Sequence, residues 1–350
     1  MSLTITAPTT AVALAAPLVG RLADRIGLRR IILWSSVLLA IATALAATSV
    51  TLPQLVAWRF VQGIVTPGIF AVTMVYIHEE WPAARAGRAT AAYISGTVTG
   101  GFTGRAVMGL MAADGAWRAG FIALAVLTSG VTAALFLWLP PERRARVRPP
   151  SASRGALSAH VRHPQLMATY AVGFCVLCTQ VAMFTYITFP LAAPPFGLST
   201  AALGSLFVVY LIGAVVTPLS GRWIDFYGHR AAFTVAVAIG VAGALLTLSP
   251  RLVTIVIGLA IFATSVFMAQ ASASSHVGAH AEQGRGLALG LYATFYYAGG
   301  SVGGALPSVL WNHGAWPACV AFIIGVQLVM LAVVWTIWKG PQPSDAIVPI

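Results

Sequence analysis

Few polar side chains stand inside the apolar runs of this chain, and their types limit the chemistry it can do. Arg59 and Arg105 are the cations within runs long enough to cross a membrane, and amide and phenol groups occur in similar runs. Because a polar group inside a bilayer is costly, we expect such residues to serve a substrate or ion pathway. The candidates for a coupling or substrate cavity, chosen by polarity, are Arg59, Gln62, Arg105, Gln180, Tyr186, Gln270, Tyr292 and Tyr296.

Two other spacings could indicate metal or redox chemistry. Cys175 and Cys178 form a C-x-x-C pair in an apolar run with no His or carboxylate nearby, which favours plain helix packing. His276 and His280 are four residues apart, but no carboxylate or Cys completes a metal site. The sequence also lacks a nucleophile–base constellation and a phosphate-binding glycine loop. We therefore expect no metal, no cofactor, and neither an enzyme nor an ATP-driven pump.

The composition indicates the environment of these residues. Of 350 residues, 59% are hydrophobic and 8% are charged, which is more apolar surface than a soluble core of this size can bury. We expect an all-α polytopic membrane protein whose partner is the lipid bilayer. The excess of 20 Lys and Arg over 8 Asp and Glu could suggest nucleic acid, but these cations lie mostly in short loops. Their distribution indicates membrane topology and no nucleic-acid partner.

Eleven apolar runs are long enough to span about 30 Å of hydrocarbon. They lie at 3–20, 31–49, 53–77, 88–111, 117–139, 165–191, 199–220, 231–249, 252–274, 286–311 and 315–338. A basic, proline-rich segment separates the fifth run from the sixth and is typical of a linker. The predicted domains are an N-terminal bundle at 1–139, a cytoplasmic linker at 140–164, a C-terminal six-helix bundle at 165–338 and a cytoplasmic tail at 339–350.

The loops carry most of their cations on one side. If the turn at residues 20–30 is cytoplasmic, 16 Lys and Arg lie on that side, and only Arg118 and Arg251 lie outside. This asymmetry follows the positive-inside rule and predicts a multi-pass protein of the bacterial inner membrane.

The turn at residues 20–30 reads G-R-L-A-D-R-I-G-L-R-R, and its Gly, Asp, Gly and Arg recur 201 positions later at residues 221–230. Gly27 permits the left-handed conformation that reverses the chain. Arg29 and Arg30 then open the next run at the level of the lipid phosphates. The chain is therefore predicted to be a repeat.

The repeat extends into the spans, because residues 93–119 align with 292–318 at an offset of 199. Spans one to five correspond to spans seven to eleven, and the run at 165–191 has no partner. We expect that the first half lacks its opening helix, either because the gene start is assigned too far downstream or because the gene has lost it. Gly96, Gly100 and Gly104 recur every four residues, which indicates close helix packing. The glycines assigned to packing are Gly96, Gly100, Gly101, Gly104, Gly299, Gly300, Gly303 and Gly304.

The first turn closely resembles the cytoplasmic loop signature of the major facilitator superfamily, G-x(3)-D-R-x-G-R-[RK], and departs from it at Leu28; the second turn has Phe226 after the Asp. The segment R-F-V-Q-G at 59–63 is similar to the R-x-x-Q-G motif of that family. The glycine-rich segments at 100–105 and 296–304, each followed by G-A-W, resemble the YnfM-type inner-membrane efflux branch. The resemblance implies two pseudo-symmetric helical bundles, here with eleven of the usual twelve spans.

The resemblance implies a monomeric secondary transporter that works by alternating access, exporting a small organic molecule in exchange for protons, with the proton gradient as its energy source. Two alternatives stay open: proton-coupled uptake, since span four lacks the Gly-Pro pair of the antiporter motif, and a transport-dead protein with a sensing or structural role. Arg59 and Arg105 could extend to the outer headgroups, but we expect them to face the interior and to be neutralised by a carboxylate on the absent helix or by an anionic substrate. The resemblance assigns a cytoplasmic gate to Gly20, Asp24, Arg25, Gly27, Arg29, Arg30, Gly221, Asp225, Gly228 and Arg230.

Overall fold

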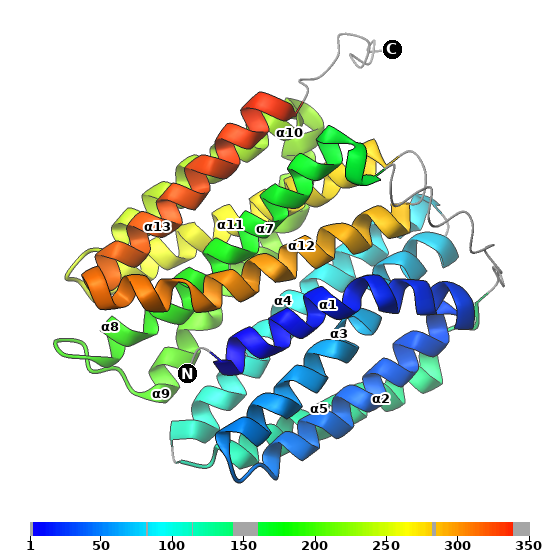
Figure 1. Ribbon diagram of the computed structural model, residues 1–350, viewed down its shortest axis with the longest axis horizontal. Helices are drawn as coiled ribbons and strands as arrows, with labels where there is room; N and C mark the ends of the chain where they lie inside the picture. The colour runs from blue at the N-terminus through cyan, green and yellow to red at the C-terminus, as the bar shows by residue number, and fades with distance from the viewer. Residues whose placement is uncertain (1–2, 82, 114, 143–159, 282–284, 339–350) are drawn as a thin grey trace.

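The computed structural model describes residues 3–81, 83–113, 115–142, 160–281 and 285–338. Every regular element within these ranges is helical, so the predicted all-α class is confirmed. The elements are α1 (Leu3–Ile26), α2 (Leu28–Ala47), α3 (Leu52–Glu80), α4 (Ala83–Ala113), α5 (Trp117–Trp138), α7 (Pro164–Tyr186), α8 (Thr188–Ala192), α9 (Thr200–Ser205), the 3-10 helix η1 (Leu206–Leu211), α10 (Ile212–Leu246), α11 (Leu252–His280), α12 (Arg285–Ala305) and α13 (Pro307–Ile337). In Figure 1, α2, α3 and α5 lie on one side of the molecule and α10, α11 and α13 on the other.

The first bundle, α1 to α5, starts with two helices joined by one glycine. Gly27 separates α1 from α2 at a φ of 101°, a left-handed conformation that residues with side chains rarely adopt. Thr51 caps α3, because its hydroxyl accepts a hydrogen bond from the N–H of Gln54 at 3.4 Å. Helix α3 packs against α1 and α2, and α2 also packs against α5.

The second bundle, α7 to α13, is built around α7. This helix packs against α11, α12 and α13, and Tyr170 and Met183 are among its many buried side chains. Gly228 interrupts α10 at a φ of 79° and divides it into two spans, as Gly27 divides α1 from α2. The two turns, which lie 201 positions apart in the sequence, therefore also share a left-handed glycine conformation.

All eleven predicted spans fall on helical segments. By length and hydropathy, eight segments within the described ranges qualify as membrane-crossing, and α1 adds a shorter apolar stretch at Thr6–Gly20. One boundary differs from the prediction, because α12 ends at Ala305 and α13 begins at Pro307, before the predicted end of span ten at residue 311. Proline lacks an N–H and suits the first turn of a helix, which accounts for the earlier break. The break predicted between spans ten and eleven is present inside α13, at Gly314 and Ala315.

The outer surface of the bundles is apolar. Leu137 and Trp138 at the end of α5 are 78% and 79% exposed, and Val126 and Val253 are 67% and 71% exposed. Many exposed large apolar side chains are unfavourable in water and suit the hydrocarbon of a bilayer. The predicted linker and tail lie largely outside the described residues, except for Pro140 to Glu142 and residues 160–164.

Candidate substrate cavity

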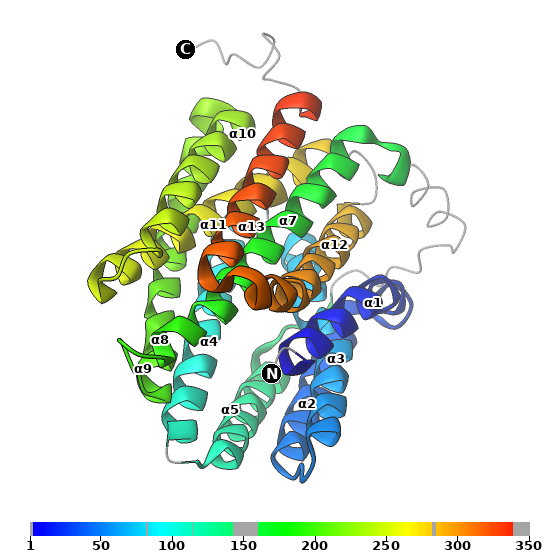
Figure 2. The same ribbon diagram turned by 60° about the vertical axis from the view of Figure 1, so that its left-hand side comes forward.

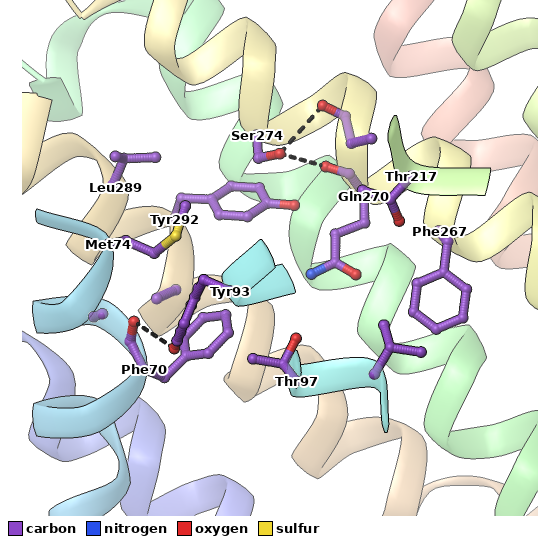
Figure 3. A pocket seen from close by; sticks show the side chains of 14 residues that line it. Phe70, Met74, Tyr93, Thr97, Thr217, Phe267, Gln270, Ser274, Leu289 and Tyr292 are labelled. Atoms are coloured by element: carbon purple, nitrogen blue, oxygen red, sulfur yellow. Dashed lines mark hydrogen bonds between the residues drawn. The ribbon is translucent and has the colours of Figure 1, made fainter. Parts of the chain in front are cut away.

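A cavity lies between the two bundles and is lined by both. The volume of the cavity is about 120 Å³. Residues of α3 and α4 form one wall and residues of α10, α11 and α12 form the other (Figure 3). The lining is Phe70, Ala71, Met74, Tyr93, Thr97, Val98, Thr217, Phe267, Gln270, Ala271, Ser274, Leu289, Tyr292 and Ala293. None of these residues carries a charge.

The cavity lies toward the cytoplasmic end of the bundles, as the loop cations assign it. Met74 is near the end of α3 and Gln270 is in the second half of α11, and both helices run toward that end. Tyr93 and Tyr292 are in the first halves of α4 and α12, which start from that end. The space is therefore closest to the side that carries the turn at residues 20–30.

Two tyrosines that face this cavity differ in how their hydroxyls are used. The Tyr93 hydroxyl donates a hydrogen bond to the carbonyl oxygen of Phe70 at 3.1 Å, which ties α4 to α3. The Tyr292 hydroxyl has no hydrogen-bond partner among the described residues, although the side chain is only 7% exposed. The Thr217 hydroxyl is likewise buried without a partner. A buried polar group without a partner costs free energy, so these groups are suited to a ligand.

The predicted residue Gln270 lies beside Tyr292. Figure 3 shows the Gln270 amide and the Tyr292 hydroxyl extending into the same space, with Tyr93 and Thr97 of α4 facing them. The Tyr292 ring is held in place by Tyr296, with ring centroids 5.9 Å apart, and by Gly173 of α7, where any side chain would collide with the ring. Of the eight cavity candidates predicted by polarity, Gln270 and Tyr292 line this space.

Three other predicted residues form hydrogen bonds between α7 and α12 of the second bundle. Tyr296 donates a long hydrogen bond of 3.4 Å to Oε1 of Gln180, which connects α12 to α7. The Tyr186 hydroxyl donates to the carbonyl oxygen of Gly304 at 2.9 Å, near the outer ends of the same two helices. None of the three appears in the lining, so they join helices or support Tyr292. Polar residues in a bundle of this size also bond between helices, and the assignment of these three residues to a coupling or substrate cavity stays a prediction.

Arg59 is bonded within its own bundle. Its Nη1 donates to Oε1 of Gln62 at 2.9 Å, and its Nε donates to the carbonyl oxygen of Thr4 at 3.3 Å. Gln62 in turn donates from Nε2 to Oγ1 of Thr43 at 3.0 Å. The network joins α3 to α1 and α2 through neutral oxygens, and neither Arg59 nor Gln62 lines the cavity.

Arg105 lies at the interface between the bundles. It is exposed, its Nη1 donates to the carbonyl oxygen of Gly101 at 2.9 Å, and its guanidinium lies 4.8 Å from the ring centroid of Phe207 and 5.1 Å from that of Tyr210. Such cation–π contacts are favourable and hold the Arg105 guanidinium against η1.

The predicted gate turns are anchored inside their own bundles. Nε of Arg29 donates to the carbonyl oxygen of Leu139 at 3.0 Å, and its backbone N–H donates to Glu142. Arg230 donates to the carbonyl oxygen of Trp335 in the last turn of α13 and lies over that indole ring, 4.9 Å from its centroid. Arg25 and Arg30 are exposed, and nothing lies within 4 Å of a Cβ built on Gly20.

The remaining gate residues are placed by their helices. Asp24 is in α1, and Gly221 and Asp225 are in α10, while their side-chain surroundings lie outside what the structure describes. The assignment of these turns to a cytoplasmic gate stays a prediction. Glu142, which the sequence did not single out, belongs to this site, since its carboxylate receives an N–H from the first turn of α2.

The predicted packing glycines divide between the two bundles. A Cβ on Gly299 or Gly303 of α12 would collide with the backbone of Phe174 or Cys178 of α7, and one on Gly300 would meet Leu177. By contrast, nothing lies within 4 Å of a Cβ on Gly96, Gly100 or Gly104, and Gly101 approaches only the Arg105 side chain. Close packing is wrong for these α4 glycines in this structure. The α12 glycines are covered by α7, and α7 is the span that has no repeat partner in the first bundle.

The histidines and cysteines considered for metal or redox chemistry lie on α7 and α11, within the helices of the second bundle. Nδ1 of His276 lies 2.9 Å from Oγ1 of Thr169, and its ring stacks between those of His280 and Trp338 at 4.0 Å from each. Within the described ranges, no group of three or more His, Cys, Asp or Glu side chains could hold a metal ion. Cys175 and Cys178 are free thiols in α7.

The sequence comparisons agree with a helical bundle whose central cavity is shared by two halves. A family model described as Major Facilitator Superfamily matches residues 1–283 and residues 185–349. The chain belongs to the major facilitator superfamily. Its members are membrane transporters, which form a non-enzymatic class. We therefore interpret this cavity in terms of transport and not of catalysis.

Individual superfamily members match nearly the whole chain. The chain is 32% identical over 333 residues to "Uncharacterized MFS-type transporter YybF" of Bacillus subtilis (strain 168), covering 94% of this chain and 82% of the relative. It is 29% identical over 338 residues to "Inner membrane transport protein YnfM" of Escherichia coli (strain K12), covering 95% and 80%. The crystal structure of the human organic anion transporter MFSD10 (TETRAN) superimposes with a TM-score of 0.75 at 19% identity, covering 95% of this chain and 83% of that chain. The last match shows the fold alone.

Sequence reasoning missed several residues that line the cavity. Phe70, Met74 and Phe267 are apolar side chains in apolar helices, so polarity could not select them. Tyr93 could have been found, because it aligns with Tyr292 at the offset of 199 and the two tyrosines lie on opposite walls.

Proposed function

We propose that this chain is a secondary active transporter that moves a small organic molecule across the bacterial inner membrane by alternating access, as proton-coupled export. The observation that carries the proposal is the cavity between the bundles, with Phe70 and Tyr93 on one wall and Gln270 and Tyr292 on the other. A site shared by two pseudo-symmetric bundles changes its accessibility when one bundle rocks against the other. The positive-inside distribution of the loops and the inner-membrane relative support the location.

Alternating access requires an outward-facing and an inward-facing state, and the contacts between the bundles support the inward-facing one. Gly109 of α4 lies against Gly204 of α9, so closely that a Cβ on either residue would be 2.9 Å from the Cα of the other. Thr10 of α1 donates to Ser301 of α12 at 3.1 Å. Both contacts lie toward the outer ends of these helices, whereas the cavity lies toward the cytoplasm. Figure 2 shows α9 beside α4 and α12 beside α1, and these contacts, with the cavity toward the other end, favour an inward-facing interpretation.

A pair of spin-label measurements tests alternating access without a known substrate. Labels at the exposed residues Leu110 and Ser205 report the outer ends of the bundles, and labels at the exposed residues Arg25 and Tyr227 report the cytoplasmic ends. We expect two populations in which one distance lengthens as the other shortens, with their ratio dependent on pH. A single, pH-independent population at both ends would support the transport-dead alternative. In vesicles with an imposed pH gradient, the direction of proton movement during substrate flux separates export by antiport from uptake by symport.

A further inference from the structure

The lining of the cavity restricts the charge of what it can bind. Among the residues that the structure describes, none that lines the cavity is charged, and the two arginines in the spans are engaged elsewhere. Arg59 is bonded to Gln62 and the carbonyl of Thr4, and Arg105 lies over the rings of Phe207 and Tyr210. A bound ion would therefore lose its hydration without gaining an opposite charge from the lining, which is costly. The lining favours an uncharged ligand.

Aromatic side chains determine the shape of the space. Phe70 and Tyr93 belong to the first bundle, with ring centroids 6.2 Å apart and ring planes inclined by 43°. Phe267 and Tyr292 belong to the second, and Met74 adds a polarisable thioether. Ring faces and edges on both walls suit a flat aromatic group, which can stack or pack edge to face.

The unpaired polar groups determine which functional groups the ligand should carry. The buried Tyr292 hydroxyl has no partner and can donate to a ligand oxygen. Gln270 extends its amide into the same space and can both donate and accept (Figure 3). The Thr217 hydroxyl is a second buried hydroxyl without a partner among the described residues. An amide or hydroxyl on the ligand would satisfy groups that the protein leaves unpaired.

We propose that this cavity binds an uncharged aromatic molecule that carries an amide or hydroxyl group, with Tyr292 as its hydrogen-bond donor and Gln270 as its amide partner. The inference rests on the proposed transport function, because the ligand that it describes would be the transported substrate. Binding itself can be measured without transport, so the two can fail separately.

A matched set of three compounds tests the charge preference. Chloramphenicol is an uncharged nitroaromatic with an amide and hydroxyls, its hemisuccinate ester adds a negative charge, and its glycine ester adds a positive charge while keeping the amide. Radiolabelled chloramphenicol would be bound to the purified full chain and displaced by each compound. We expect both charged derivatives to compete at least about tenfold more weakly than chloramphenicol. Equal or tighter binding of either ion, or no saturable binding of chloramphenicol, would overturn the inference.

Two tyrosine variants test the role of the hydroxyl. Tyr292→Phe keeps the ring against Tyr296 and Gly173 and removes only the unpaired hydroxyl. We expect it to weaken chloramphenicol binding by about three- to tenfold, the effect of one hydrogen bond. Tyr93→Phe is the matched control, since its hydroxyl is already bonded to Phe70, and we expect less than about a twofold change. Equal effects of the two changes would remove Tyr292 from the proposal.

A third variant covers the case in which Tyr292→Phe disturbs the fold. Gln270→Met preserves the length of the side chain and removes its amide, and should also weaken binding by about three- to tenfold while size-exclusion profiles stay unchanged. Unchanged affinity in a well-folded Gln270→Met variant would contradict the assignment. If chloramphenicol binds as described but the spin-label distances show one state, the transport proposal fails and the ligand class stands.

Discussion

Arg29 and Arg230 stand 201 positions apart, and each donates a hydrogen bond from its guanidinium to a backbone carbonyl at the end of the last helix of its own bundle. The acceptor is Leu139 after α5 in the first case and Trp335 in the last turn of α13 in the second. The last carbonyls of a helix lack intrahelical partners, so a cation placed there satisfies one of them and interacts favourably with the helix dipole. The repeated arginine therefore fastens each cytoplasmic turn to its own bundle, in addition to any part it has in a gate.

Replacing Arg29 should destabilise the first bundle, while replacing its neighbour should not. Arg29→Gln removes the bond to Leu139, and we expect a loss of about 1 kcal/mol, or a fall in Tm of roughly 2–4 °C. Arg30→Gln is the control, because Arg30 is exposed and has the same charge. Thermal unfolding of the purified variants measures both. Equal shifts would show that net charge, and not the bond to Leu139, sets the stability.

The internal repeat supplies a matched pair of glycines for a packing test. Gly303→Val would push a side chain into the backbone of Cys178, whereas Gly104→Val, at the equivalent position 199 residues earlier, would enter open space. Overpacking costs typically about 1–3 kcal/mol, so the yield of folded Gly303→Val should fall sharply and that of Gly104→Val should not. Monodispersity after membrane extraction is the measurement. A comparable loss for Gly104→Val would mean that another segment covers α4.

The sequence predicted the helices well and the cavity only in part. Apolar runs, the linker and the glycine turns are local signals, so spans and breaks could be placed within a few residues. The cavity depends on which faces of α3, α4, α11 and α12 meet, and hydropathy does not show that when both faces are apolar. Of the residues selected by polarity, Gln270 and Tyr292 line the cavity, whereas the Tyr186 hydroxyl bonds to the carbonyl of Gly304. Glu142 was missed because its partner, the N–H of Arg29, is more than a hundred residues away in sequence.

The glycine contact between α4 and α9 should control closure of the outer side. Gly109→Val places a side chain against the backbone of Gly204, and we expect it to hold the outer ends of the bundles apart. The spin-label distance between Leu110 and Ser205 should lengthen, and the inward-facing population should fall. Gly130→Val in α5 is the control, since nothing lies within 4 Å of a Cβ at that position. An unchanged distance in Gly109→Val would show that closure does not need this contact.

Arg59 and Arg105 should be needed for the conformational response to pH, because the repeated scaffold does not require them. Arg105 aligns with Gly304, and no arginine occupies the position equivalent to Arg59 in the second half. Arg59→Gln also leaves Gln62 without its donor, at a cost of about 1–3 kcal/mol for a buried acceptor. We expect Arg59→Gln and Arg105→Gln to remove the pH dependence of the Leu110–Ser205 distance while membrane insertion persists. Arg59→Lys should restore it poorly, since an ammonium cannot reach both Thr4 and Gln62 in the geometry of the guanidinium. Arg251→Gln, which changes an exposed arginine outside the spans, is the control for charge. A normal pH response in both Gln variants would show that these two arginines only anchor their helices.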